Sequence, residues 1–439
     1  MKKRKAWKWL MIALAAMAAI MGAIVWDAHR RADRIFREHD LDVTTRIAAI
    51  RARPKVSRPP LFGEAIPGNG WSALEKALDA FKAIPYADAE KVLESCGLLP
   101  EEIKDEASLD AIFTNYAPAF DQLREVLRYE RLDAAHAYES GFPMSVDYGI
   151  YAITASKFLA GLGTHRHRAG QDALALEPLN QALVLAHDVG RNGPVVTFLV
   201  QVVCEGIAED AWRTVLDGHE LSADRLRKAT EAMDLLWKFR PSCVDSIEVE
   251  DVMLRRAVAD LALGALVLDP LGFWGGRSWR YLFSRRLCYA GALPICKQYF
   301  ADLREVGKLS CWEREAATLR VRNHASIDRN QIARMALPNT GKIFRRDAIA
   351  QMGWTLMRVA TALAWYEAEK GAPPASLRDL VPRYLSAVPD CPLTGKPLGY
   401  APGKVWSYGV DGVDNGGMPN PKGDEEPGGD VVWVVTRKK

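Results

Sequence analysis

The stretch KIFRRDAIAQMGWTLMRVATALAWYEAEKG, residues 342–371, has the clearest helical pattern in the chain. Its apolar side chains recur at spacings of three and four, which places them on one face of a helix. These residues are Ile349, Met352, Leu356, Val359, Leu363 and Tyr366. Gly371 follows the last periodic residues and two prolines come soon after, so we expect the helix to end there.

The residues after this helix predict a small antiparallel sheet. A short helix, ASLRDLV, comes next, and three strand-like segments follow it, LGYA, KVWSYG and DVVWVV. A turn separates the first two strands, and a long loop of glycine, proline and acidic residues separates the last two. This order of elements predicts an α+β module over residues 342–437, in which a three-stranded antiparallel sheet covers the long helix.

Residues 71–336 predict a separate α-helical domain. Amphipathic segments such as WSALEKALDAFKAI and SADRLRKATEAMDLLWKF follow one another with short glycine-containing turns. Ser72 and Ser222 are the expected N-caps of these two helices. Paired helices of this kind favour stacked antiparallel hairpins. No repeat of fixed period is present, so the expected architecture is an irregular α-hairpin array, and the chain as a whole is expected to be mainly α.

The N-terminus predicts a membrane anchor. Residues 9–26, WLMIALAAMAAIMGAIVW, carry no charge and have a tryptophan at each end, which is typical of a transmembrane signal anchor. A basic tail, residues 1–8, precedes this run. By the positive-inside rule we expect a cytoplasmic N-terminus, a single pass through the inner (cytoplasmic) membrane and a periplasmic bulk. A cleavable signal peptide is the competing interpretation. Residues 27–70 would form a charged stalk and a Pro/Gly-rich linker.

Composition and motifs exclude several classes of function. The 439 residues are 49% hydrophobic and 26% charged, which is ordinary for a folded protein. The net charge is +3 and no Lys/Arg stripe is interleaved with aromatic residues, so nucleic acid is not an expected partner. None of the seven cysteines forms a CxxC pair, and G-x-S-x-G, H-E-x-x-H and P-loop motifs do not occur.

The C-terminal module carries several motifs that together suggest a family. They are WYEAEKGAPPASLRDLVPRYL, VPDCPLTGKPLGYAPG, VWSYGVDGVDNGG and GGDVVW. This end of the chain resembles the major, G-type pseudopilins of type II secretion and related uncharacterised bacterial envelope proteins. The N-terminus lacks the leader glycine and the glutamate of a pseudopilin, and Cys391 stands where an acidic residue would be expected. The resemblance therefore implies a borrowed pseudopilin-like module rather than a filament subunit.

The same resemblance implies a calcium site in the loop before the last strand. The family's loop binds calcium through two aspartates and backbone carbonyls, and the matching residues here are Asp411 and Asp430. Asp414 is a plausible third oxygen ligand. Calcium is a hard cation that accepts carboxylates and carbonyls in irregular geometry. The alternative is a solvated acidic loop without a metal ion.

Two functions remain open from the sequence. The first is a non-enzymatic, membrane-anchored envelope protein, in which a helical scaffold carries a calcium-stabilised pseudopilin-like interaction module, linked to type II secretion or pilus-like machinery. Its expected partners are the lipid bilayer, through the N-terminal helix, and other envelope proteins. The second is a membrane-anchored hydrolase with its site in the helical domain, around residues 245–325. A cluster of Glu, His and Arg in a deep pocket would favour the second function.

Overall fold

The computed structural model describes most of the chain. The described residues are 2–55, 57, 60–95, 105–141, 144–263, 279–421, 423–424 and 426–437. Within helices, the side chains that are not described are those of residues 2–10, 13, 93, 263 and 279–285. The predicted basic tail, residues 1–8, therefore has no described side chains, and part of the region proposed for a hydrolase site lies outside the described residues.

The protein is mainly helical with a small sheet, as the sequence predicted. The first helices are α1 (Lys2–Arg51), α2 (Trp71–Lys82), α3 (Tyr86–Ser95), α4 (Glu106–Asn115), α5 (Ala117–Val126), α6 (Tyr148–Arg168), α7 (Asp172–Gly190) and α8 (Val195–Leu216). The later helices are α9 (Ala223–Phe239), α10 (Cys243–Leu263), α11 (Trp279–Val306), α12 (Cys311–Arg322), α13 (Ala325–Arg329), α14 (Gln331–Ala336) and α15 (Thr340–Lys370). The short 3₁₀ helices are η2 (Tyr138–Ser140) and η3 (Leu377–Leu380).

The strands are short and form small sheets. They are β1 (Ile66–Asn69), β2 (Tyr129–Arg131), β3 (Asp217–His219), β4 (Gly399–Ala401), β5 (Lys404–Ser407), β6 (Val431–Val434) and β7 (Thr436–Arg437). Strands β4, β5 and β6 form the antiparallel sheet that the sequence predicted, in that order. Strand β7 pairs with β3, which directly follows α8, so the C-terminal strand is attached to the helical domain.

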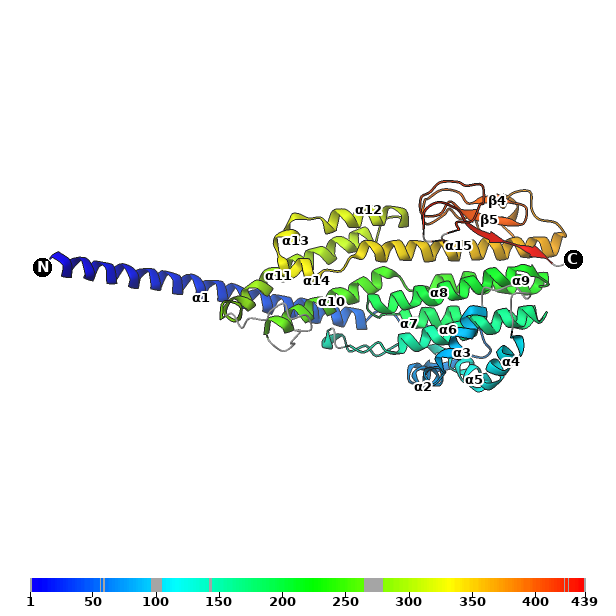
Figure 1. Cartoon of the computed structure of the whole chain (residues 1–439), viewed down its shortest axis with the longest axis horizontal. Coiled ribbons are helices and arrows are strands. Elements are labelled where there is room, and N and C mark those ends of the chain that lie inside the picture. Colours follow the sequence, from blue (N-terminus) through cyan, green and yellow to red (C-terminus); the bar gives the residue numbers. More distant parts are fainter. Residues whose placement is uncertain are drawn as a thin grey trace.

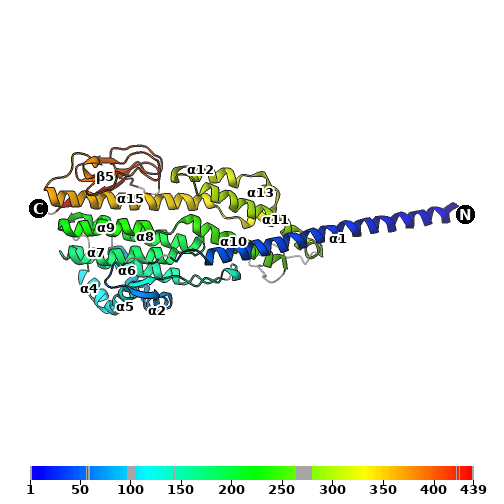
Figure 2. The same ribbon diagram turned by 180° about the vertical axis from the view of Figure 1, so that it is seen from behind.

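Helix α15 lies at the centre of the layered body. Figure 1 shows the β4–β6 sheet on one side of α15 and helices α8 and α9 on the other, and Figure 2 shows the same order from behind. The predicted apolar stripe is buried at Met352, Leu356, Val359 and Leu363. Burial extends around the whole helix in its second half, because protein covers it on both sides. A single apolar core therefore includes residues of both α15 and the helical domain.

The local signals for helix ends have mixed outcomes. Gly371 ends α15 in the left-handed conformation with φ 78°, and its N–H donates to the Glu367 carbonyl at 2.8 Å. The Ser222 side chain accepts from the Arg225 N–H, so this predicted N-cap is confirmed. The predicted cap at Ser72 is wrong, because α2 begins at Trp71 with Gly70 as its N-cap, so Ser72 lies inside the helix.

The predicted membrane anchor is wrong on this structure. Helix α1 runs without a break from Lys2 to Arg51 and projects from one end of the body (Figure 1). No helix in the described part of the chain is both long and apolar enough to cross a membrane, which overturns the predicted single-pass inner-membrane localisation.

The second half of α1 packs against the body. Phe36 lies in one buried cluster with residues of α10 and α11, and Val43 and Ile47 lie in another with residues of α10. Arg255 of α10 is fully buried and donates to Asp42 at 2.7 Å. The charged segment that the sequence assigned to a stalk is thus helical, and its described apolar face is covered by other helices.

Candidate functional site

Asp430 organises the long loop between β5 and β6. This loop, residues 408–430, is here called the aspartate loop; residues 422 and 425 lie outside the described part of it. Asp430 is fully buried just before β6. Its Oδ2 accepts from the backbone N–H of Asn415 at 3.1 Å and of Gly417 at 2.7 Å. The carboxylate thus draws the middle of the loop towards the start of the last strand.

The other two predicted site residues close the same loop. Asp411 accepts from the N–H of Val413 at 3.0 Å and from the N–H of Gly428 at 2.8 Å, so it joins the beginning of the loop to its end. Asp414 accepts from the Gly416 N–H at 2.9 Å and from Trp406 Nε1 at 3.2 Å. Charge-assisted bonds of this kind are stronger than neutral ones. The three aspartates are therefore the internal supports of one loop.

The electrostatics of the loop are compatible with a cation. Burial is the main cause that raises the pKa of Tyr408, and the nearby carboxylates of Asp414 and Asp430 raise it further. Lys404 Nζ donates to the Gly417 carbonyl at 3.2 Å. The buried side-chain oxygen of Asn415 has no hydrogen-bond partner among the described residues. Carboxylate, amide and carbonyl oxygens are the ligand types that calcium prefers.

The three aspartates do not converge on a single point in this arrangement. Across the described ranges, no group of three or more His, Cys, Asp and Glu side chains is placed to hold a metal ion. Each of the carboxylates Asp411, Asp414 and Asp430 accepts backbone N–H groups instead. The side-chain oxygens of the loop are of the kind that calcium binds. To bind it together, the aspartate carboxylates would have to rotate away from the backbone N–H groups that they now accept from.

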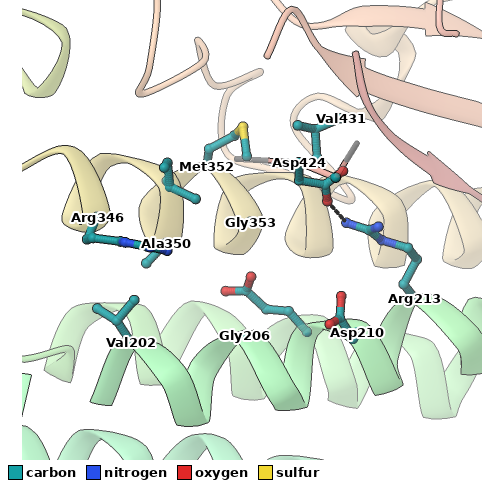
Figure 3. Close-up of a pocket in the computed structure, with 13 residues that line it drawn as sticks. Val202, Gly206, Asp210, Arg213, Arg346, Ala350, Met352, Gly353, Asp424 and Val431 are labelled. Carbon is teal, nitrogen blue, oxygen red and sulfur yellow. Dashed lines mark hydrogen bonds and ion pairs between the residues drawn. The ribbon is translucent and has the colours of Figure 1, made fainter. Parts of the chain in front are cut away.

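The aspartate loop also covers a pocket on the helical domain. This pocket of about 380 Å³ lies between α8 and α15 (Figure 3). Gly423 and Asp424 of the loop, together with Val431 at the start of β6, line the pocket from this side. Asp424 accepts from Arg213 of α8 at 2.7 Å, and this ion pair joins the loop to the helix. Sequence analysis did not identify this pocket, because its walls come from segments far apart in the chain.

A cluster of charged side chains is buried beside the pocket. Glu205 of α8 accepts two hydrogen bonds from Arg240, both at 2.9 Å, and His187 Nε2 lies 3.1 Å from its Oε1. Arg240 also donates to Asp347 of α15 at 2.9 Å, and Arg314 donates to the second oxygen of Asp347 at 3.3 Å. The Arg240 charge outweighs burial and lowers the pKa of Glu205 to about 2, so Glu205 is ionised.

This cluster contains the Glu, His and Arg side chains expected of a hydrolase, but their arrangement is that of a structural network. Glu205, Arg240 and Asp347 are buried and satisfy one another. Burial lowers the pKa of His187 and favours its neutral form. The only early signal was Glu205 itself, an acidic residue in the apolar segment QVVCEGI. Comparisons with protein-family models, curated proteins and solved structures found no match to this chain.

Proposed function

We propose that this protein is a non-catalytic scaffold that presents a pseudopilin-like module to partner proteins of type II secretion or pilus-like machinery. The aspartate loop carries this proposal, because it joins two strands of a three-stranded sheet that packs on a long helix. Asp411 and Asp430 occupy the positions that the sequence resemblance assigns to calcium binding, and Asp414 lies in the same loop as a third oxygen donor. The burial and mutual pairing of Glu205 and Arg240 support a structural rather than a catalytic role for the nearby charges.

Calcium is the proposed stabiliser of the loop. The oxygens that could bind calcium belong to Asp411, Asp414, Asp430 and the Asn415 side chain, whose oxygen has no hydrogen-bond partner among the described residues. All of them are hard donors. Binding a cation among them would relieve the repulsion between the carboxylates. A ligand that binds the folded state alone raises stability by mass action. Calcium would therefore hold the face of the module in the form that partners recognise.

The test is the melting temperature of the full chain with a chelator and with excess calcium. We expect calcium to raise it in the wild-type protein and to have little effect on Asp411→Ala and Asp430→Ala. Glu426→Gln is the matched control, because Glu426 lies in the same loop and its side chain accepts no described hydrogen bond. Equal melting temperatures in chelator and calcium would rule out the calcium site. An equal gain with magnesium would show a nonspecific ionic effect.

The scaffold role needs a separate test. The full chain can be chemically crosslinked in its native cells and the crosslinked proteins identified. With calcium present, we expect repeated experiments to recover a consistent set of partners. Asp411→Ala should weaken that recovery, whereas Glu426→Gln should not. Hydrolytic activity that disappears with Glu205→Gln while the fold is retained would contradict the non-catalytic assignment.

A further inference from the structure

Glu209 is a buried acid for which the described structure provides no hydrogen-bond partner. It lies on α8 one turn after Glu205 and is nine-tenths buried. Its Oε1 has no partner among the described residues, although the residue lines the pocket between α8 and α15. An unpaired buried polar atom is costly, so such an atom in a pocket indicates a missing ligand group.

The backbone around Glu209 is shaped to admit its carboxyl group. A Cβ atom built on Gly353 of α15 would lie only 1.9 Å from Glu209 Oε2, so any side chain there would displace the carboxyl group. A Cβ atom built on Gly206 of α8 would meet nothing within 4 Å. Gly206 also lines the pocket, so open space remains beside the carboxyl group. The absence of a side chain at Gly353 thus leaves space for the Glu209 carboxyl group, and its absence at Gly206 leaves space for a ligand.

The charges around the pocket favour a cation over an anion. Arg213 is already paired with Asp424, and Figure 3 shows Arg346 at the opposite end of the pocket from Arg213. Asp210, an exposed residue on α8, lines the pocket together with Glu209 and connects it with solvent. A cationic group beside Glu209 would meet an acid that has no partner among the described residues. An anion there would gain no ion pair with Glu209 and would also face Asp210.

The remaining walls favour an organic cation with an apolar body. Apart from glycine and alanine, four lining residues are apolar, namely Val202, Ile349, Met352 and Val431. The methylene groups of Arg346, which also lines the pocket, can add to this apolar surface. A cavity of about 380 Å³ lies within the usual range for small-molecule sites. A bare metal ion would leave this apolar surface unused, and the described acids offer no three-ligand set.

We propose that the pocket between α8 and α15 binds a small aliphatic amine, whose ammonium group pairs with Glu209 and whose carbon chain lies against the apolar walls. Binding converts the neutral carboxylic acid to a carboxylate. The proton leaves Glu209 for the solvent, and the ammonium group keeps its own three protons. This inference goes beyond the scaffold role, and it does not depend on calcium.

Proton release follows from the surroundings of Glu209. Burial, then the charges of Glu205 and Asp210, raises its pKa well above the usual range, while Arg240 and Arg213 act in the opposite direction. The free acid therefore holds its proton, whereas an ammonium ion would favour the ionised form. Amine binding should strengthen as pH rises, until the amine itself begins to lose its proton near about pH 10.

The experiment compares three probes of one shape with different charges: n-pentylamine, 1-pentanol and pentanoate. Titration calorimetry of the full chain in chelator, in two buffers of different ionisation enthalpy, measures both affinity and proton release. We expect pentylamine to bind at least about tenfold more tightly than pentanol, because its ammonium group forms a hydrogen bond between charged groups with Glu209. Binding should release about one proton. Pentanoate should not bind.

Two variants locate the site. Glu209→Gln keeps the shape of the side chain and should weaken pentylamine about tenfold or more and abolish proton release. Gly206→Leu should fill the pocket and prevent binding while Glu209 is intact. Glu231→Gln on α9, an exposed residue paired with Arg227, is the matched charge control and should bind as the wild type does.

Several outcomes would overturn the proposal. Equal affinity for pentanol and pentylamine would show an apolar cavity without charge recognition. Pentylamine binding that survives in both Glu209→Gln and Gly206→Leu would place the amine elsewhere, and no binding at all would remove the site. Because all titrations use chelator, a failed calcium test of the aspartate loop leaves these results interpretable.

Discussion

Arg240 donates two parallel hydrogen bonds to Glu205, both 2.9 Å long, and both side chains are buried inside the protein. Arg240 follows α9 directly, whereas Glu205 lies in the middle of α8. The same guanidinium group reaches Asp347 of α15, so one cation neutralises acids from two helices. Buried charges are tolerated only when they are paired in this way. The network therefore holds α15, and with it the C-terminal sheet, against the helical domain.

Removal of Arg240 should destabilise the whole protein. Arg240→Ala leaves Glu205 and Asp347 with less compensation in a buried site, and we expect a loss of about 3–5 kcal/mol in the free energy of unfolding. Urea denaturation measures this loss. Arg227→Ala breaks only exposed ion pairs on α9 and should cost much less stability than Arg240→Ala. Similar losses for both variants would show that the buried network has no special role.

The contact between Gly353 and Glu209 can be tested by a double-mutant cycle. Gly353→Ala places a methyl group where the Glu209 carboxyl group lies, and we expect a destabilisation of about 1–3 kcal/mol from overpacking. Glu209→Ala removes the obstructing carboxyl group. Adding Gly353→Ala to the Glu209→Ala variant should therefore cost much less stability than adding it to the wild type. Additive effects of the two changes would mean that the residues are not in contact.

Glu209 should also make stability depend on pH. Folding raises the pKa of Glu209. Its contribution to folding stability is therefore fully present below the unfolded-state pKa of 4.5 and is lost as pH rises through the folded-state pKa. The facing charged groups are Glu205, Asp210, Arg240 and Arg213. Glu209→Gln has no titrating group at this position, so the stability of this variant relative to the wild type should increase as pH rises above 4.5.

Denaturation midpoints at several pH values would measure this difference between Glu209→Gln and the wild type. The exposed-acid variant Glu231→Gln should keep the wild-type pH dependence, because Glu231 lies on the solvent side of α9. A constant difference between Glu209→Gln and the wild type as pH rises above 4.5 would contradict the raised pKa.

Asp430 should be the most important of the three aspartates for the stability of the loop. Asp430→Ala leaves the N–H groups of Asn415 and Gly417 without their acceptor, and we expect a loss of about 1–3 kcal/mol. Hydrogen exchange should become faster at these two amides. Glu426→Ala in the same loop should change neither quantity. Unchanged exchange in Asp430→Ala would show that the carboxylate does not hold the loop.

Local sequence determined the individual elements of the C-terminal module. The spacing of apolar residues at three and four located α15, and Gly371 set its end, because helix faces and left-handed caps depend on neighbours within a few residues. The β-branched run before the C-terminus located β6 for the same reason. The chain also placed Asp411, Asp414 and Asp430 in one loop between two strands, which follows from their order alone.

Only the tertiary structure decided which of these residues meet. Glu205 and Arg240 are 35 positions apart, and Arg240 and Asp347 are 107 apart, so no local spacing predicts their pairing. The continuous path of α1 and its packing on α10 and α11 likewise required the assembled body. Glu209 Oε1, which has no hydrogen-bond partner among the described residues, is enclosed by α8, α15 and the aspartate loop. Desolvation and pairing are properties of surroundings built from distant segments, and residue order alone does not specify them.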